Sequence, residues 1–436
     1  MQKEQKTTAL VWFGNDLRIH DNEVLSKAIN ENNHVIGVYC INPVLLKKSN
    51  FGYRKLGKFR AKFLLQSLQE LQDNLRKKNI SLLVYFDSAE SKIPQLCEQF
   101  GVNFIYKQKE WTSEEASETN KVRNLIPNTE IKEEYNQFLY HPEDILSDPN
   151  KIPNVFTAFR KKLEKYVDIR DEVSITREFS SNNLIQNTGS IPTLEDLGFE
   201  DSIVDDRTAF PFKGGETSAI DRLNDYFFNT KKLGFYKKTR NGLVGVDYSS
   251  KFSPWLANGT ISARTIYWQV KKFEQEYYKN QSTYWLIFEL IWRDYFKYIS
   301  MKFDNNIFKL GGILKKDYWW SKDENVIDKW INGETQDDFV NANMIELKET
   351  GWMSNRGRQN VASYFAKELE IDWRIGAAYF EEQLLDYDVH SNYGNWMYVS
   401  GVGNDPRDRK FNTQMQAERY DGNGRFRKLW LQSTLF

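Results

Sequence analysis

The chain has 436 residues, and its 60 basic and 60 acidic side chains give a formal net charge of zero. This length predicts two domains, because single hydrophobic cores stop growing at roughly 250–300 residues. The balanced charge argues against a nucleic-acid binder that works by bulk attraction, and the chain has no apolar run long enough to span a membrane. Two cysteines are too few for a disulfide framework or a zinc site. The first residues show no signal or transit pattern, so we expect a cytoplasmic protein.

The first 135 residues alternate between strand and helix patterns. Buried strands are predicted at 9–13, 35–39, 82–86 and 104–106, and apolar residues at helical spacing predict an amphipathic helix over 55–78. Strands that alternate with helices form a doubly wound parallel sheet, so we predict an α/β domain over residues 1–135. Residues 136–208 include a long stretch rich in Ser, Asn, Thr and Asp, which we interpret as an interdomain linker.

The remaining residues, 209–436, are predicted to form an all-α domain. Helices are predicted at 219–229, 262–278, 283–300, 325–331, 339–350, 360–368 and 373–385. Eleven of the thirteen tryptophans lie after residue 250. A large aromatic core would explain this excess, and so would stacking on a planar cofactor or base, or electron transfer. Composition alone leaves these three explanations open.

Several familiar motifs are missing, and their absence narrows the chemistry. The first predicted strand is followed by GNDLR rather than GxGxxG, and no P-loop occurs, so neither an NAD-type fingerprint nor an NTPase site is expected. Only four histidines occur, and none lies between residues 142 and 389, which argues against imidazole general-base catalysis in the helical domain. Residues 386–392 resemble the start of a calcium loop but lack its glycine and glutamate, so no metal site is expected.

Polar segments of the helical domain offer groups for a charged ligand. Ser253 and Pro254 are interpreted as the N-cap and first residue of a helix, preceded by the hydroxyls of Ser249 and Ser250. This segment is either an anion site or simply a well-capped helix. Two further segments, 351–360 and 386–396, are rich in Asn and Gly and are predicted to be polar turns.

Two groups of charged residues allow a structural and a functional interpretation. The apolar helix 283–300 carries Glu289 and Arg293 four residues apart, where they form an internal ion pair or place a carboxyl in a desolvated cleft, and we favour the ion pair. Lysines and one arginine between residues 231 and 240 form a basic cluster that is either a solvated face or part of a groove. Together, the polar and aromatic segments suit a dinucleotide that bears a large planar ring.

These segments resemble the photolyase/cryptochrome family, and specifically its DASH branch. The resemblance covers almost the whole chain, and its strongest stretches are FKGGET (212–217), SSKFSPWL (249–256), WLIFELIWRDY (285–295), SNRGRQNVAS (354–363), SNYGNW (391–396) and GVGNDP (401–406). Near the N-terminus, Gly14 departs from the arginine that the family usually has, which puts an interdomain contact at that position in doubt.

The resemblance implies a U-shaped FAD in the helical domain. Residues expected to hold its phosphates and ribityl chain are Tyr236, Ser249, Ser250, Phe252 and Ser253. Residues expected around the isoalloxazine are Arg293, Arg358, Asp386 and Asp388, with Arg358 paired to Asp386, and Asn392 is expected to face flavin N5. Glu289 and Asn355 are expected to lie close enough to contact both cofactor and substrate.

The resemblance also assigns an electron-transfer chain and an antenna. Trp396, Trp373 and Trp320, the last in preference to its neighbour Trp319, match the chain from flavin to surface. Glu110 matches the DASH residue associated with a 5,10-methenyltetrahydrofolate antenna, although a solvated glutamate at a helix start is an alternative interpretation.

The substrate face follows from the same resemblance. Glu289, Trp292 and Asn355 match residues that contact a flipped pyrimidine dimer, and Arg356, Gln359 and Tyr398 are expected to face DNA. Photolyases that repair duplex dimers have Met and Trp where this chain has Gln359 and Tyr398, which favours a preference for single strands because a less stacking pocket supports base flipping less. No histidine lies near 354–359, so repair of (6-4) lesions is not expected.

The function that the resemblance implies is light-driven repair of cyclobutane pyrimidine dimers, preferentially in single-stranded DNA, by electron transfer from excited reduced FAD. The alternative is a blue-light photoreceptor with a regulatory role and little repair activity. Single-stranded DNA is the expected partner, nonspecific binding of duplex DNA or RNA is compatible with a basic groove, and a monomer is expected.

Overall fold

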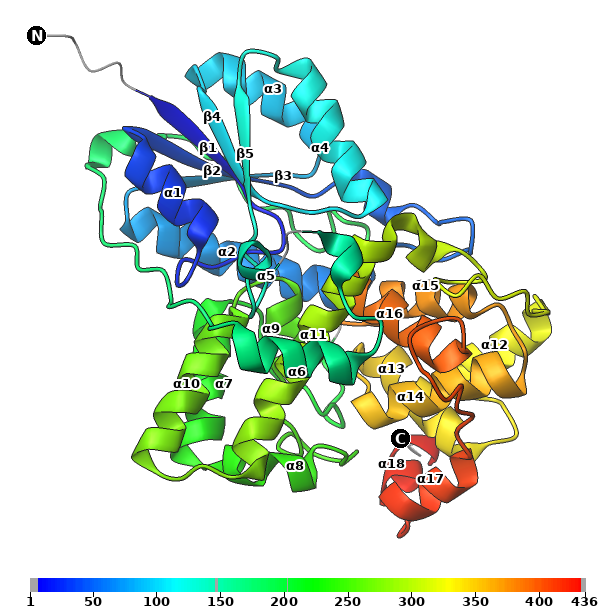
Figure 1. Cartoon of the computed structure of the whole chain (residues 1–436). Helices are drawn as coiled ribbons and strands as arrows, with labels where there is room; N and C mark the ends of the chain where they lie inside the picture. The colour runs from blue at the N-terminus through cyan, green and yellow to red at the C-terminus, as the bar shows by residue number, and fades with distance from the viewer. Residues whose placement is uncertain (1–6, 146–147, 202, 433–436) are drawn as a thin grey trace, which may run out of the picture.

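The computed structural model describes residues 7–145, 148–201 and 203–432. A five-stranded sheet with its helices forms one end of the molecule, and a larger body of helices forms the other (Figure 1). The predicted fold class, an α/β domain followed by an all-α domain, is therefore confirmed. Among the described residues, no helix has both the length and the apolar character needed to cross a bilayer.

The sheet is parallel throughout, with the strand order β3-β2-β1-β4-β5. Its strands are β1 (Thr8–Trp12), β2 (His34–Cys40), β3 (Ser81–Tyr85), β4 (Phe104–Gln108) and β5 (Glu130–Glu134). The sequence pattern predicts the first four strands but not β5. The reason is that β5 reads EIKEE, and a charged edge strand lacks the apolar signal that identifies buried strands.

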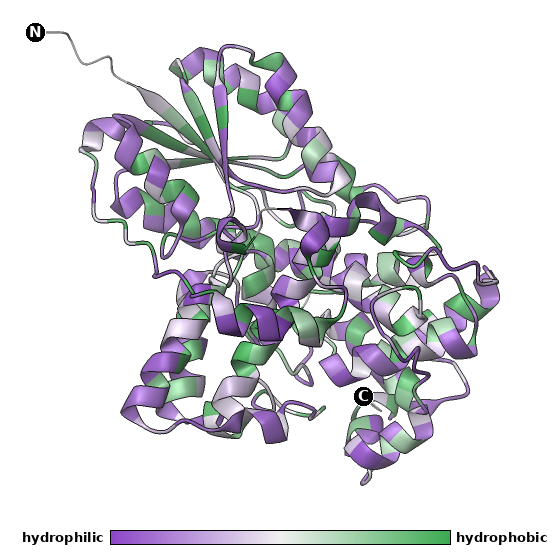
Figure 2. Ribbon diagram, viewed as in Figure 1, coloured by the Kyte–Doolittle hydropathy of each residue, from purple (hydrophilic) through white to green (hydrophobic). Residues whose placement is uncertain are grey.

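Side chains of β1 alternate between the two faces of the sheet, as the strand period of two requires. Ala9 and Val11 pack in one core with residues of α1 (Glu23–Glu31) and α2 (Lys58–Lys77). Leu10 and Trp12 pack in a second core with residues of α3 (Ala89–Phe100) and α4 (Ser113–Leu125). Both faces of the sheet are thus covered, and Figure 2 shows the hydrophobic strands lying between more polar helices.

The segment between the sheet and the helical body packs against both. It contains α5 (Pro142–Ile145) and α6 (Phe156–Tyr166), and Phe156, Phe159 and Leu163 of α6 belong to the core of the helical body. Farther along, Phe179 and Leu194 pack against the sheet core. The domain boundaries stated from the sequence remain a prediction.

The helical body is built around one long apolar helix. Its helices are α7 (Glu216–Asn224), α8 (Tyr236–Thr239), α9 (Ser253–Ala257), α10 (Ala263–Glu276), α11 (Gln281–Phe303), α12 (Glu324–Asn332), α13 (Asp338–Thr350), α14 (Asn355–Ser363), α15 (Trp373–Gln383), α16 (Val389–Ser400), α17 (Thr413–Tyr420) and α18 (Arg425–Leu431). Helix α11 is apolar nearly all round and packs against α8, α10 and α16, as expected of a buried helix.

Helix α16 corrects one prediction, since the segment from Asp386 to Trp396 was expected to be a polar turn. The carboxyl of Asp388 accepts a hydrogen bond from the Ser391 amide at 2.8 Å and so caps a helix that begins at Val389. The asparagines and glycine that favour a turn lie inside this helix. Close packing explains the glycine, because a Cβ on Gly394 would lie 2.3 Å from the Phe296 ring.

Buried ions join the two halves of the molecule. Asp21, after β1, pairs with Arg264 of α10 at 2.7 Å, and both side chains are almost fully buried. Arg18 donates from Nη1 to the carbonyl of Gly259 at 2.9 Å. Gly14 has open space where a Cβ would lie, so this residue makes no side-chain contact across the boundary.

Candidate functional site

A cavity of about 530 Å³ lies in the helical body, between α8, α9, α11, α14 and α16. This volume is within the usual range of ligand sites. The residues predicted to bind cofactor or substrate that line the cavity are Tyr236, Ser249, Ser250, Phe252, Ser253, Glu289, Trp292, Arg293, Asn355, Arg356, Arg358, Gln359, Asp386, Asp388 and Tyr398. They come from positions 236, 249–253, 289–293, 355–359 and 386–398. The fold therefore brings together residues that are far apart in the sequence.

One wall of the cavity carries the three serines predicted to bind phosphate. Arg222 of α7 holds this loop, donating to the carbonyls of Ser249 and Ser250. Ser253 was predicted to be the N-cap of α9, and this prediction is wrong. Phe252 occupies the N-cap position without a side-chain hydrogen bond, and α9 has five residues. The three serines therefore line the cavity, and Ser253 has no helix-capping role.

Lys251 adds a buried positive charge to the same wall. Its backbone is left-handed (φ 67°), and its ammonium lies over the rings of Tyr248 and Trp352, 3.2 and 4.5 Å from their centroids. Burial lowers the pKa of Lys251 and raises that of Glu346 in α13 to about 8, while each charge opposes the shift in the other. The ammonium and one Glu346 carboxyl oxygen have no hydrogen-bond partner among the described residues.

Two ion pairs also lie at the cavity. Arg358 pairs with Asp386 at 2.9 Å, as was expected, and also donates to the carbonyl of Met353. Asp388 pairs with Lys297 at 2.9 Å. Burial alone would raise the pKa of Asp388, but the neighbouring Lys297 lowers it below its usual value. Lys297 therefore favours the ionised form of the Asp388 carboxyl beside the cavity.

Asn392 is near the cavity but does not line it in this structure. Its side-chain amide donates to the carbonyl of Ala377 in α15 at 3.0 Å, which fixes the orientation of the group. Its predicted position opposite flavin N5 stays a prediction.

Glu289 pairs with Arg240, which corrects the favoured interpretation of helix 283–300. Its carboxylate accepts a hydrogen bond from Arg240, whereas Arg293 turns away and donates to the carbonyls of Gln137 and Leu256. Burial raises the pKa of Glu289, and Arg240 opposes that shift. Glu289 is therefore a carboxyl in a desolvated cleft, held by a cation from α8.

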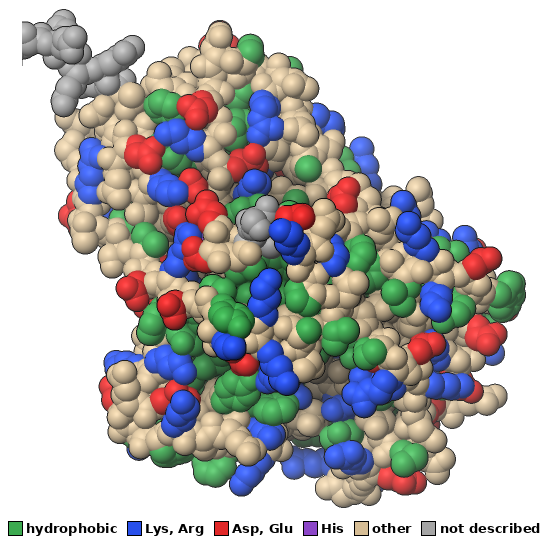
Figure 3. Space-filling view, in the orientation of Figure 1, with side chains coloured by type: hydrophobic (Ala, Val, Ile, Leu, Met, Phe, Trp, Pro, Cys, Tyr) green, Lys and Arg blue, Asp and Glu red, His purple; other side chains and the backbone are tan. Residues whose placement is uncertain are grey.

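The predicted DNA-facing residues surround Trp292 at the cavity. One face of the Trp292 ring stacks on Phe156 of α6 at 3.6 Å, and its edge contacts the Tyr398 ring at 5.9 Å. Tyr398 accepts a hydrogen bond from Arg409, and Gln359 accepts one from Arg356. Figure 3 shows Lys and Arg side chains around a hollow in the lower half of this face. The arrangement can bind an anionic ligand that presents a planar group.

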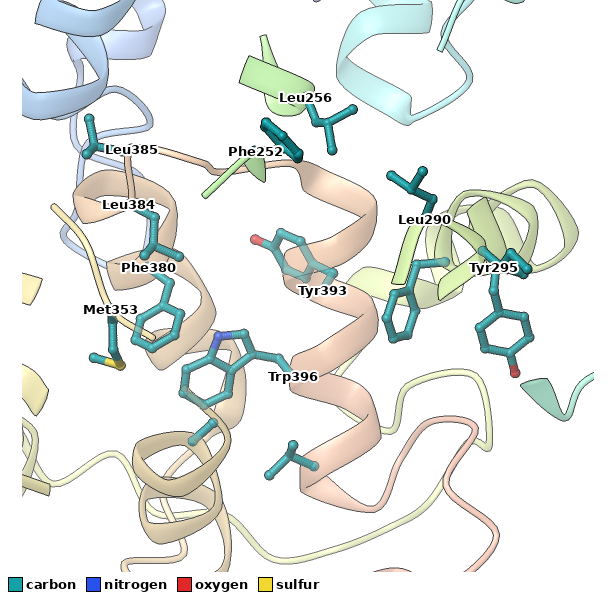
Figure 4. Packing of buried hydrophobic residues seen from close by; sticks show 14 of the residues in the cluster. Phe252, Leu256, Leu290, Tyr295, Met353, Phe380, Leu384, Leu385, Tyr393 and Trp396 are labelled. Atoms are coloured by element: carbon teal, nitrogen blue, oxygen red, sulfur yellow. The ribbon is translucent and has the colours of Figure 1, made fainter. Parts of the chain in front are cut away.

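Trp396, Trp373 and Trp320 lie on neighbouring segments. Trp396 packs its ring against α15, with Phe380 beside it (Figure 4). Trp373 begins α15 and is fully buried, and the bridge between Ser321 and Ile371 holds Trp320 near the start of that helix. Trp319 is 75% exposed whereas Trp320 is partly buried, and the choice of Trp320 stays a prediction.

Glu110 lies where β4 ends, next to the helical body. It accepts a hydrogen bond from Gln108 at 2.6 Å, and burial raises its pKa to about 7 although Lys297 opposes the shift. The adjacent Trp111 reaches into the helical body, donating to the Ser300 hydroxyl at 2.8 Å and stacking on His390 at 4.6 Å. Lys297 therefore lies between Glu110 and the Asp388 carboxylate of the cavity.

The sequence did not predict the roles of Arg240 and Phe156 at the cavity. Arg240 was recognised as part of a basic cluster but not as the partner of Glu289, since the two are 49 positions apart. Phe156 was missed because it lies in a segment interpreted as linker. Apolar spacing over 156–163, with phenylalanines at 156 and 159 and Leu163, could have identified α6.

Comparisons with known proteins decide the family. The family models for DNA photolyase and for the FAD binding domain of DNA photolyase match residues 9–176 and 285–434. Cryptochrome DASH of Synechocystis sp. is 45% identical over 98% of this chain and 88% of its own length, and that of Danio rerio is 44% identical over 97% and 83%. The chain belongs to the photolyase/cryptochrome family, in its cryptochrome DASH branch.

Solved structures of the family agree with this assignment. A Synechocystis cryptochrome structure has a TM-score of 0.94 at 43% identity and covers 99% of this chain and 89% of its own. A class III photolyase from Agrobacterium tumefaciens has a TM-score of 0.83 at 25% identity, covering 99% and 87%. The likeness covers the α/β and helical parts together, so the whole fold is that of the family.

The cavity fits the FAD that the family's binding domain implies. Six basic residues line it against four acidic ones, and this excess suits a diphosphate. The serine hydroxyls and the buried Lys251 ammonium supply hydrogen-bond donors, and the Arg358–Asp386 pair supplies a donor and an acceptor. The predicted residues that line the cavity would hold the group, together with Lys251, whereas Asn392 does not line it.

Proposed function

We propose that this protein is a light-driven lyase that splits cyclobutane pyrimidine dimers, with a preference for single-stranded DNA. The observation that supports it best is the position of Glu289, a partly buried carboxyl that lines the FAD cavity together with Trp292 and Asn355. A carboxyl in this position can hydrogen-bond a base edge that enters the cavity. Arg356 and Arg409 line the same cavity and donate hydrogen bonds to Gln359 and Tyr398. Their charges can attract the phosphates that flank the lesion.

Within this proposal, the cofactor carries the redox chemistry and the chain positions the substrate. Reduced FAD, when bound and excited by blue or near-ultraviolet light, supplies the electron that splits the dimer. Glu289 holds the dimer by a hydrogen bond, and Arg240 must release the Glu289 carboxylate when the dimer enters, since the two are paired in this structure. Trp292 contributes its free ring face, because Phe156 covers the other.

The preference for single strands rests on Gln359 and Tyr398. Extruding a dimer from a duplex costs a few kcal/mol, and less from a single strand. Gln359 and Tyr398 are both engaged with arginines, and Tyr398 meets Trp292 edge-on rather than extending its stacking surface. The cavity therefore offers little stacking energy to offset extrusion.

For the antenna, we infer a methenyltetrahydrofolate site beside Glu110. Supporting it are the end of β4, where parallel sheets bind ligands, and a partly buried carboxyl whose pKa is raised. The test adds 5,10-methenyltetrahydrofolate to the purified protein and to the Glu110→Gln variant. The absorbance of the bound ligand is then compared between the two proteins. Equal binding by both proteins would remove Glu110 from the site.

The deciding experiment illuminates the purified, reduced protein with oligonucleotides that contain one dimer, single-stranded or duplex, at equal salt. We expect restoration of the single-stranded substrate and slower restoration of the duplex. Glu289→Gln should lower the repair rate at least about tenfold, because a charge-assisted hydrogen bond is worth about 1.5–3 kcal/mol. The matched control is Lys238→Gln, which removes a charge on α8 but outside the cavity.

Two results would contradict the proposal. Equal repair of both substrates would remove the single-strand preference, and a flavin-containing protein that repairs neither would favour the photoreceptor role instead. A protein without flavin absorbance would remove both.

A further inference from the structure

Trp396 has a second aromatic route to the surface, separate from Trp373 and Trp320. Its ring contacts the ring of Trp330, a fully buried residue of α12, with 6.3 Å between centroids. Trp330 in turn contacts Tyr379 of α15 at 5.9 Å, and Tyr379 contacts Tyr53 at 5.4 Å. Each contact lies within the range of paired aromatic rings, and Tyr53 is partly exposed.

Helix α15 divides the two routes by its own geometry. Gly376 touches the Trp396 ring, because a Cβ there would lie 2.3 Å from ring atom Cη2. Trp373 lies three residues before Gly376, and Tyr379 lies three residues after it. Residues three apart share a face of a helix, so Trp373 and Tyr379 lie one turn before and one turn after the point where Gly376 contacts the Trp396 ring. An electron hole on Trp396 can therefore move along two routes, one through Trp373 and one through Trp330 and Tyr379.

The end of the second route carries negative charge that stabilises such a hole. Burial raises the pKa of Tyr53 to about 12, with Asp328 and Glu382 adding to the shift. Burial likewise raises the pKa of Tyr379, and Tyr53, Glu382 and Glu349 add to that shift. These carboxylates place negative charge near the two phenols, and Coulomb attraction to a neighbouring anion favours loss of an electron from a ring.

We propose that Trp330, Tyr379 and Tyr53 form a second electron-transfer branch, which supplies electrons to the flavin in parallel with Trp373 and Trp320. An electron that leaves Trp396 for the photoexcited oxidised flavin is replaced from Trp330, then from Tyr379, and finally from Tyr53. Tyr53 loses one electron and its phenol proton passes to water, which leaves a neutral tyrosyl radical. A thiol in solution then returns one hydrogen atom to that radical.

This branch rests on FAD binding and on photoreduction, but not on DNA repair. It therefore stands or falls independently of the proposed lyase activity. Substrate-free protein that contains oxidised flavin, verified by its absorbance, is the material for the test.

The experiment uses Trp373→Phe protein, in which the first branch is blocked. Blue light in the presence of a thiol should still reduce the flavin, and electron paramagnetic resonance should detect a tyrosyl radical. Growth on ring-deuterated tyrosine should narrow that signal. Adding Tyr379→Phe should lower photoreduction to the level of Trp396→Phe and abolish the radical signal, while adding Tyr53→Phe should abolish the long-lived signal.

The matched control is Tyr393→Phe in the same Trp373→Phe background. Tyr393 lies on α16 and contacts Trp373 at 6.2 Å, but it lies outside the second branch. Its substitution should leave both photoreduction and the radical signal unchanged. The proposal is overturned if Trp373→Phe alone abolishes photoreduction, or if the radical depends on Tyr393 rather than on Tyr379 and Tyr53.

Discussion

Single residues at the cavity take their chemistry from partners that are distant in the sequence. Glu289 lies on an apolar helix, yet its charge is balanced by Arg240 of α8 rather than by its helical neighbour Arg293. Lys251 and Glu346 are both buried near the same wall and lack hydrogen-bond partners among the described residues. Such groups are costly unless a ligand or water completes them, so they mark a binding site rather than a stabilising core.

Trp396 is the residue whose substitution tests the electron-transfer chain most directly. Both branches begin at its ring, so Trp396→Phe should slow photoreduction of oxidised flavin at least about tenfold, or roughly 1.4 kcal/mol in activation free energy. Phenylalanine keeps the packing but is much harder to oxidise. The measurement is the loss of flavin absorbance under blue light with a thiol present, and Trp319→Phe, at an exposed position, is the control. Unchanged rates in Trp396→Phe would exclude its role.

At the scale of elements, α15 and α16 must approach closely to place Trp396. Gly376→Ala should destabilise the protein by about 1–3 kcal/mol, because the new Cβ would lie 2.3 Å from a rigid indole ring. Thermal unfolding measures this effect, and the displaced ring should also slow flavin photoreduction. Gly14→Ala is the matched control, since it adds the same methyl group into open space. Equal stability of the two variants would show that the helices separate without cost.

The loop between β4 and α4 should make stability depend on pH through Glu110. Its pKa is raised from 4.5 to about 7, so the folded protein binds more protons than the unfolded chain between these values. Stability therefore falls as pH rises through this window. Glu110→Gln should match the wild type near pH 4.5 and exceed its stability by up to about 3 kcal/mol above pH 7. Unfolding at pH 5 and pH 8 tests this, with the exposed Glu98→Gln as control; a pH-independent difference would contradict it.

The elements also show what a sequence can and cannot predict. Strands β1 to β4 and helix α2 follow from apolar spacing, because burial on a fixed face imposes a period. Strand β5 and helix α16 do not, since β5 is charged and α16 is held by the Asp388 cap and by close packing at Gly394. The Arg358–Asp386 pair followed from the family resemblance, whereas the Glu289–Arg240 pair depends on how α8 packs against α11.

At the scale of the whole molecule, the α/β part and the helical body are joined by buried polar contacts. Asp21 accepts hydrogen bonds from Ser262, Arg264 and the Val173 amide, so one carboxylate connects the sheet, the intervening segment and α10. Trp111 makes a second connection through Ser300 and His390. A ligand beside Glu110 would thus lie at a boundary fixed from both sides, close to Lys297 and the FAD cavity.

Asp21→Asn tests how strongly the two parts are joined. Removing this partner leaves Arg264 with Glu23, 3.8 Å away, as its remaining ion-pair partner among the described residues, so we expect a loss of up to about 3–5 kcal/mol. Asparagine tolerates the left-handed backbone at this position (φ 52°), so the loss reports the charge rather than strain. Urea unfolding measures it, and Lys121→Gln, which breaks an exposed pair with Glu90, should cost less than about 1 kcal/mol. The double variant Asp21→Asn/Arg264→Met should recover much of the lost stability, because the buried arginine charge is then absent. Equal losses in the single and double variants would show that the Asp21 carboxylate acts through its other hydrogen bonds.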